Sequence, residues 1–218
     1  MKKPWIQVSV DTKDIPSARK HVSHALSINA EWIEVGTPLL TFAGIESIRD
    51  VAGMVGNRTV VADFKALDGV EQYFVRAGEL GASVATVMAV ANEASILKAI
   101  ESGHRNGVKI QVDLLNVPKN EIAEVAEKIT KMGADYFLLH LAIDELLRNP
   151  DADPLDGLDE VVKASPIPVG PVVFTKEQGV EAIKRGASYV VIGYPLITAV
   201  DAEAQLQIFA NEIRGSVV

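Results

Sequence analysis

The sequence predicts an α/β fold, a single (β/α)8 TIM barrel domain that covers residues 1–218. Short apolar runs rich in β-branched residues alternate with longer segments of helical periodicity, which is the pattern of strands joined by crossover helices. About eight such strand–helix units fit into the chain, as expected for a small barrel of this fold. No linker or break in composition divides the sequence, so we expect one domain.

Each expected strand is a short and almost continuous apolar run, because strands of a parallel sheet are buried on both faces. The runs cover residues 6–10, 32–35, 59–62, 83–88, 108–112, 136–139, 167–169 and 189–192. An apolar pattern at helical spacing follows each run. These expected helices cover residues 15–28, 44–55, 70–80, 94–105, 119–132, 155–164, 176–185 and 202–214. Pro118 and Pro154 stand near two of the helix starts, where proline is tolerated.

The alternative fold is a doubly wound open sheet, which shows the same alternation of strands and helices. Such a sheet usually carries a glycine-rich turn after its first strand. Here residues 11–14 read Asp-Thr-Lys-Asp, without glycine. This turn favours the closed barrel.

Composition excludes several classes of function. The chain has 21 Lys and Arg against 29 Asp and Glu, a net charge of −8, which argues against nucleic acid or an anionic membrane as the partner. No apolar run approaches the roughly 20 residues that cross a bilayer, and the first residues lack the apolar core of a signal peptide. Without cysteine the chain has no disulfide, thiolate nucleophile or zinc–thiolate site. We expect a soluble cytoplasmic protein.

Polar side chains end most of the expected strands: Asp11, Glu34, Asp63, Asp113 and His140. Lys65 follows Asp63 by two residues, which places both side chains on the same side of an extended segment. In a closed barrel the C-terminal strand ends converge on one mouth, where the active sites of this fold lie. We therefore expect these groups to share one small volume.

Glu34 and Asp63 come from neighbouring strands and are candidate ligands for Mg²⁺, which takes oxygen donors and often only one or two carboxylates. Lys65 adds a positive charge that offsets carboxylates crowded in one site. Asp68 extends the cluster or caps the following helix. A single aspartate after a strand is commonly a turn former, so Asp11 and Asp113 also have that simpler interpretation.

His140 differs from the other histidines of the chain. His21, His24 and His104 lie in expected helices beside polar neighbours, which indicates surface positions. His140 follows a buried strand, where a lone histidine is often a hydrogen-bonded core residue. Its convergence with the carboxylates favours a proton donor or acceptor instead.

These residues stand in five ordered motifs: residues 6–11 (Ile-Gln-Val-Ser-Val-Asp), 34–39 (Glu-Val-Gly-Thr-Pro-Leu), 62–68 (Ala-Asp-Phe-Lys-Ala-Leu-Asp), 112–115 (Val-Asp-Leu-Leu) and 140–144 (His-Leu-Ala-Ile-Asp). The series resembles the hexulose-6-phosphate synthase and 3-keto-gulonate-6-phosphate decarboxylase branch of the orotidine-monophosphate decarboxylase superfamily, almost from end to end. The resemblance implies a homodimer of (β/α)8 barrels with active sites at the interface and a sugar or sugar-phosphate substrate.

The resemblance also implies roles for individual residues. Glu34 and Asp63 match the Mg²⁺ ligands, Lys65 matches the lysine beside the enediolate, and Asp68 matches an aspartate contributed across the dimer interface. Strand-end positions used for substrate contacts and proton transfer correspond to Asp11, Asp113 and His140. Thr37, in the second motif, and Gly193, the family glycine that remains after the eighth strand, are candidate substrate-binding residues.

Within this branch the motifs at Asp113 and His140 resemble the synthase more than the decarboxylase, which usually carries Glu at position 113 and Arg at position 143. The implied reaction is aldol addition of formaldehyde to ribulose 5-phosphate, or to a close hydroxy-ketone analogue, through a metal-stabilised enediolate. One alternative is decarboxylation of a β-keto sugar acid phosphate. The other is a non-catalytic barrel that binds a metabolite.

The chain departs from the family where family members bind the substrate phosphate, with glycine pairs after the seventh and eighth strands. Here residues 172–175 read Val-Val-Phe-Thr and residues 193–195 read Gly-Tyr-Pro. Val173, Phe174 and Tyr194 add bulk, and Pro195 has no N–H donor. We expect a substrate without phosphate, or a phosphate held in another geometry by Thr175 or Lys176.

Overall fold

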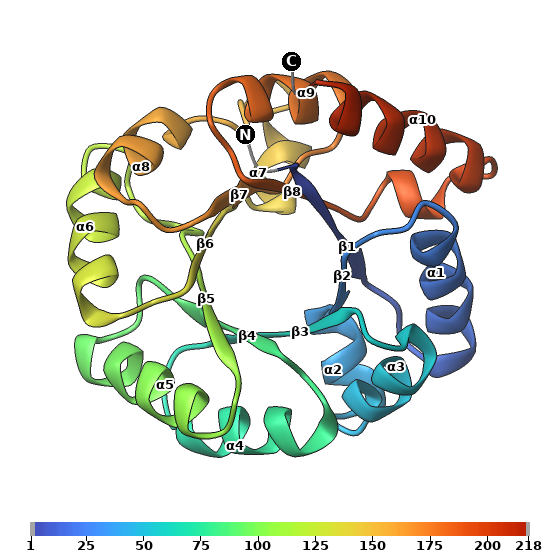
Figure 1. The fold of residues 1–218 in the computed structure, drawn as a ribbon. Helices are drawn as coiled ribbons and strands as arrows, with labels where there is room; N and C mark the ends of the chain where they lie inside the picture. The colour runs from blue at the N-terminus through green and yellow to red at the C-terminus, as the bar shows by residue number, and fades with distance from the viewer. Residues whose placement is uncertain (1–2, 217–218) are drawn as a thin grey trace.

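Eight parallel strands form a closed barrel surrounded by helices in the computed structural model, which describes residues 3–216 (Figure 1). The strands are β1 (Trp5–Val10), β2 (Trp32–Val35), β3 (Thr59–Ala66), β4 (Val84–Met88), β5 (Lys109–Asp113), β6 (Tyr136–Leu139), β7 (Val169–Pro171) and β8 (Tyr189–Ile192). Neighbours along the chain pair in order, and β8 pairs with β1. Between β7 and β8 the amide of Val173 donates to the carbonyl oxygen of Val191 at 2.9 Å. The predicted (β/α)8 barrel is confirmed.

Helices cover the outside of the sheet, as the alternating pattern predicted (Figure 1). They are α1 (Ile15–Ser27), α2 (Thr37–Ala43), α3 (Ser47–Val55), α4 (Glu71–Leu80), α5 (Glu93–Arg105), α6 (Ile122–Met132), α7 (Ile143–Arg148), α8 (Leu158–Ala164), α9 (Lys176–Lys184) and α10 (Ala202–Gly215), with a 3₁₀ turn at Leu196–Thr198. Among residues 3–216, no helix has both the length and the apolar character that crossing a membrane requires.

Some expected boundaries are wrong. The helix expected over residues 44–55 begins only at Ser47, because Gly44 has a φ of +84° that a right-handed helix does not allow. The helix expected from residue 155 begins at Leu158, after Gly157 in the left-handed region. The strand expected over residues 167–169 lies at Val169–Pro171 instead. Helices α2 and α7 were not expected.

Strand β3 continues four residues beyond its expected end at Ala62. Its pairing with β4 shifts register between Ala62 and Ala66, which is the mark of a β-bulge. Asp63 and Lys65 therefore lie within the irregular end of the strand rather than in the loop after it.

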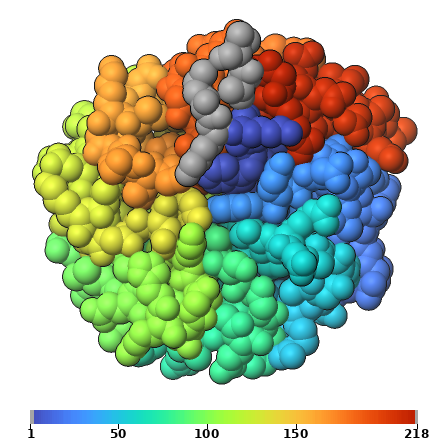
Figure 2. All heavy atoms as spheres, viewed as in Figure 1, coloured from blue at the N-terminus to red at the C-terminus, as the bar shows by residue number. Residues whose placement is uncertain are grey.

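Aromatic side chains fill the N-terminal end of the barrel. Trp5, Trp32, Tyr136 and Tyr189 stand at the starts of four strands, and the rings of Trp5 and Tyr189 stack with centroids 4.9 Å apart. The space-filling view shows side chains occupying the centre of the ring seen in the ribbon (Figure 2). A separate, larger apolar core lies between the sheet and the helices. We therefore expect the functional residues at the opposite end of the barrel, where the strands have their C-terminal ends and where the active sites of this fold lie.

Candidate active site

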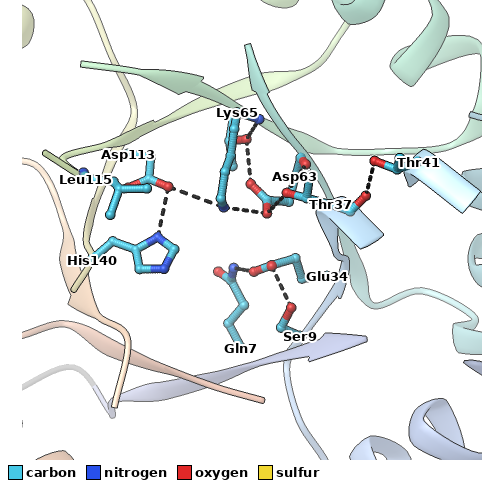
Figure 3. A network of polar contacts seen from close by, with 11 residues as sticks. Gln7, Ser9, Glu34, Thr37, Thr41, Asp63, Lys65, Asp113, Leu115 and His140 are labelled. Carbon is cyan, nitrogen blue, oxygen red and sulfur yellow. Dashed lines mark hydrogen bonds and ion pairs between the residues drawn. The ribbon is translucent and has the colours of Figure 1, made fainter. Parts of the chain in front are cut away.

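A cavity of about 470 Å³ lies at the C-terminal ends of the strands. Its polar lining contains most of the sequence-predicted residues: Asp11, Glu34, Thr37, Asp63, Lys65 and His140. Gly193 also lines it. Asp113 lies behind Lys65 and His140, fully buried, and contacts both. Figure 3 shows two sets of polar contacts: one joins Thr37, Asp63, Lys65, Asp113 and His140, and the other joins Glu34 to Gln7 and Ser9.

Asp63 is the most heavily hydrogen-bonded group of the first set. Its Oδ2 accepts from Lys65 Nζ and from Thr37 Oγ1, both at 2.6 Å. Its Oδ1 accepts from Thr86 Oγ1 at 2.9 Å. Thr37, the first residue of α2, therefore orients a carboxylate of the neighbouring strand. Thr86 was missed at the sequence level, although a hydroxyl inside the otherwise apolar β4 was a visible signal.

Lys65 lies between two acidic residues. Its Nζ is 2.6 Å from Asp63 Oδ2 and 3.5 Å from Asp113 Oδ2. Burial alone would lower the pKa of Lys65, but the negative charges of Asp63, Asp113 and Glu34 outweigh it and raise the pKa. The side chain of Lys65 is therefore protonated at neutral pH.

Glu34 is buried at the end of β2, where Oε1 accepts from Ser9 Oγ at 2.7 Å and Oε2 accepts from Gln7 Nε2. Burial, and then the charges of Asp63 and Asp11, raise the pKa of Glu34 to about 8. The sequence analysis missed Gln7 and Ser9. Their signal was the period of two that they share with Asp11 along β1, which puts all three on one face of the strand.

His140 and Asp113 form a pair, with Nδ1 of the imidazole 3.0 Å from Oδ2 of the carboxylate. Asp113 Oδ1 accepts from the amide of Leu115 at 2.9 Å. Burial would lower the pKa of His140, but the charge and hydrogen bond of Asp113 raise it. Burial would raise the pKa of Asp113, but His140, Lys65 and the Leu115 amide lower it. The pair thus favours an imidazolium next to a carboxylate, on the wall of the cavity.

Asp11 fits between two glycines. A methyl group on Gly36 would lie 2.0 Å from Asp11 Oδ1, and one on Gly193 would lie 3.2 Å from Asp11 Oδ2. The side chain of Asp11 is in contact with solvent in the open cavity, although protein atoms surround the rest of it. This surrounding protein is the main cause of the raised pKa of Asp11. Gly193 therefore makes room for a carboxylate at the end of β8.

Asp68 does not line this cavity. It is exposed, in the loop between β3 and α4, and borders a separate surface hollow with Glu71 and Lys98. Its expected contribution across a dimer interface stays a prediction.

The donor chemistry of Glu34 and Asp63 fits Mg²⁺. Both carboxylates line the same cavity from adjacent strands. The raised pKa of Glu34 is due first to burial and then to the negative charges of Asp63 and Asp11, and a cation would relieve the latter part. Within residues 3–216, no group of three or more His, Cys, Asp or Glu side chains is arranged to hold a metal ion. Mg²⁺ is often held by only one or two carboxylates, with water and substrate oxygens as its other ligands.

The segments after β7 and β8 carry the bulky residues that the sequence indicated. Val173 is buried, while Phe174 and Tyr194 line the cavity. Thr175 caps α9, and Lys176 Nζ lies 2.9 Å from Glu177 Oε1. Neither Thr175 nor Lys176 lines the cavity.

Comparison with known proteins agrees with this architecture. The sequence pattern of the Orotidine 5'-phosphate decarboxylase / HUMPS family matches residues 4–208. A 3-hexulose-6-phosphate synthase of Staphylococcus aureus is 29% identical over 167 residues, which are 75% of this chain and 77% of that protein. A crystal structure of 3-hexulose-6-phosphate synthase superposes with a TM-score of 0.85 at 25% identity, over 98% of this chain and 100% of the other. A 3-keto-L-gulonate-6-phosphate decarboxylase of Vibrio cholerae superposes with a TM-score of 0.82 at 23% identity, over 99% and 97%.

Proposed function

Because the chain belongs to the Orotidine 5'-phosphate decarboxylase / HUMPS family, we propose that it is a Mg²⁺-dependent carbon–carbon lyase. Its reaction is aldol addition of formaldehyde to ribulose 5-phosphate or to a close hydroxy-ketone analogue, through an enediolate. The observation that carries this proposal is the ammonium of Lys65, which lies 2.6 Å from Asp63 in the cavity that Glu34 also lines.

The reacting end of the substrate lies in the polar half of the cavity. Lys65 offsets the negative charge of the enediolate as it develops. His140 in its neutral form accepts the proton that leaves the substrate carbon as the enediolate forms and returns it to the oxygen of the added formaldehyde, while Asp113 orients the imidazole through the 3.0 Å contact. Asp11 and Thr37 line the same cavity and contact substrate hydroxyls.

Glu34 and Asp63 would hold the Mg²⁺ ion, which when bound supplies positive charge to vicinal oxygens of the substrate. Hydrogen bonds fix both carboxylates beforehand. Ser9 holds Glu34 at 2.7 Å, and Thr37 holds Asp63 at 2.6 Å. These side chains orient the donors, so little rearrangement precedes ion binding.

The test is turnover of a hydroxy-ketone and formaldehyde by the purified protein with Mg²⁺, followed by NMR of the product. We expect product with the native chain and a turnover roughly 10²–10³-fold lower with Lys65→Ala. Unchanged turnover by Lys65→Ala contradicts the proposal. Carbon dioxide release from 3-keto-gulonate 6-phosphate without formaldehyde addition supports the decarboxylase alternative, and tight sugar binding without any turnover supports the non-catalytic one.

We further propose a homodimer in which Asp68 completes the cavity of the partner. Leu67, directly before Asp68, is 53% exposed, and Tyr73 on the following helix is 44% exposed. Large exposed apolar side chains of this kind are typical of subunit interfaces. Sedimentation velocity measures the assembly, and mixed variants test the shared site.

In a mixture of Lys65→Ala and Asp68→Ala chains, each nearly inactive alone, heterodimers contain one site with both residues intact. Random reassortment then restores about a quarter of the native activity. No recovery, with reassortment verified by mass spectrometry, contradicts the shared site.

A further inference from the structure

One wall of the cavity is apolar, in contrast to the carboxylates and the ammonium opposite. It is built by Leu138, Leu141, Ile143, Val172, Phe174 and Tyr194. These residues come from the ends of β6 and β7, from α7 and from the segment after β8. A ligand in this cavity therefore has one polar and one apolar end.

Two backbone donors after β7 are already used inside the protein: that of Phe174, which lines the cavity, and that of Thr175, which follows it outside the lining. The amides of Phe174 and Thr175 both donate to Gln178 Oε1, at 2.8 Å and 3.1 Å. In return, the amide of Gln178 donates to Thr175 Oγ1 at 3.3 Å. In barrels of this fold, the segments after the seventh and eighth strands and a nearby helix N-terminus commonly bind phosphate. Here the side-chain oxygen of Gln178 accepts from both amides as part of a capping box at the start of α9.

The cavity offers no free cation to a phosphate. Within the part of the chain that the structure describes, its lining contains two groups that carry positive charge, Lys65 and His140. Lys65 lies 2.6 Å from Asp63, and His140 lies 3.0 Å from Asp113. Both charges are thus already compensated by carboxylates.

The remaining charges near this wall oppose an anion. Asp11 lies next to Gly193, at the same end of β8 as Tyr194. Lys176, at the start of α9, pairs with Glu177 at 2.9 Å and stays outside the cavity. A phosphate dianion would therefore meet a carboxylate and apolar side chains.

We infer that the substrate is an unphosphorylated hydroxy-ketone whose far end is uncharged and apolar and packs against Phe174 and Tyr194. This inference rests on the proposed function for the reacting end and narrows its substrate class. Gln178 excludes phosphate by occupying the two amide donors. The cavity, at about 470 Å³, lies in the size range of small-molecule sites.

The catalytic test compares substrates that share one hydroxy-ketone end. With formaldehyde and Mg²⁺, we expect kcat/KM for 1-hydroxyhexan-2-one to exceed that for ribulose 5-phosphate roughly tenfold or more, because apolar contacts replace an unpaired phosphate. D-ribulose is the third substrate in the comparison. It has neither the phosphate nor an apolar tail, so it separates the effects of these two groups. Faster turnover of ribulose 5-phosphate than of both neutral ketones overturns the inference and leaves the proposed function standing.

A binding test keeps the inference falsifiable when no substrate turns over. Inorganic phosphate is titrated while the backbone amide resonances of Phe174 and Thr175 are followed by NMR. We expect no shift in the native protein, a shift in Gln178→Ala, and none in Gln178→Glu, which keeps an acceptor oxygen. Gln205→Ala, at a half-buried position of α10, is the matched control and behaves like the native protein.

Millimolar phosphate that shifts both amides in the native protein overturns the inference. A third outcome is that phosphate shifts neither amide resonance of the native protein and that no ketone is turned over. This outcome contradicts the proposed function but not the inference, since the site then excludes phosphate without catalysing the aldol reaction.

Discussion

The ammonium of Lys65 lies 2.6 Å from Oδ2 of Asp63, and Lys65 reaches it from a backbone conformation with φ of +45°. This left-handed region is uncommon for residues with a side chain. The amide of Lys65 donates to Thr86 Oγ1 at 2.9 Å, which helps to hold the conformation. Strained residues of this kind cost on the order of 1–3 kcal/mol and cluster at functional sites. The backbone conformation that positions the Lys65 ammonium therefore lowers the stability of the fold.

Replacing Lys65 by Ala leaves Asp63 and Asp113 buried without their common cation. We expect the free energy of unfolding to fall by about 3 kcal/mol, the lower end of values for a broken buried ion pair. We expect kcat/KM to fall roughly 10²–10³-fold, as for loss of one group that stabilises an oxyanion. Urea unfolding and product NMR measure the two effects.

The matched control is Lys128→Ala, which removes an exposed ammonium 2.7 Å from Glu93. Its unfolding free energy stays within about 0.5 kcal/mol of the native value. Equal stability of the two variants contradicts a stabilising role for the Lys65 ammonium.

The barrel was predictable because its strands are apolar runs that only a doubly covered parallel sheet buries. The unexpected helices were not. Helix α7 has no buried residue, and α2 buries only Leu39, so neither shows an apolar face in the sequence. Periodicity reports burial, and a short helix exposed on most sides leaves no such pattern.

The site was predictable to the extent that barrel geometry brings strand ends together. Glu34, Asp63 and His140 line one cavity for this reason. The supporting residues were harder to find, because the role of a hydroxyl such as that of Thr86 depends on a hydrogen-bond partner on another strand. The contacts between Gln178 and Thr175 follow the capping-box spacing, which is visible in the sequence, whereas the contact with the Phe174 amide depends on the loop conformation after β7.

Glu34→Gln tests the metal site. Glu34 is buried beside Asp63 and Asp11, whose charges disfavour its ionised form, so the isosteric amide leaves the metal-free protein at least as stable as native. Ligand binding stabilises a folded protein by about 2.7 kcal/mol at 100 times the dissociation constant. We expect Mg²⁺ to raise the Tm of the native protein and to have little effect on the variant, as measured by thermal unfolding.

Glu124→Gln on the exposed face of α6 serves as the control and retains the full response to Mg²⁺. A Glu34→Gln protein with the native Mg²⁺ response shows that Glu34 is not a ligand.

The pair of His140 and Asp113 makes stability depend on pH. The pKa of His140 in the folded protein lies above its ordinary value of 6.5, so the charged pair stabilises fully below that value and is lost as pH rises through the raised pKa. A hydrogen bond between charged groups contributes about 1.5–3 kcal/mol. His140→Gln therefore destabilises more at about pH 5.5 than at about pH 9, as measured by urea unfolding.

The Asp113→Asn background removes the partner charge. In that background burial lowers the pKa of His140, so His140→Gln no longer destabilises more at about pH 5.5 than at about pH 9. A pH difference that persists without Asp113 assigns the effect to another group.

Gly36→Ala tests the position of Asp11. The φ of Gly36 is −67°, which alanine adopts without strain, so any effect comes from the new methyl group, which would lie 2.0 Å from Asp11 Oδ1. We expect Asp11 to be displaced, the KM for the hydroxy-ketone to rise and the unfolding free energy to fall by about 1–3 kcal/mol, as in overpacked cores. Steady-state kinetics and urea unfolding measure both.

Gly53→Ala is the matched control, because no atom lies within 4 Å of its added methyl group inside α3. Alanine there stabilises the helix by about 0.5–1 kcal/mol. Combining Gly36→Ala with Asp11→Ala removes the clash, so the double variant regains most of the stability that Gly36→Ala loses. If the two losses simply add, the methyl group acts elsewhere and Asp11 does not occupy the space next to Gly36.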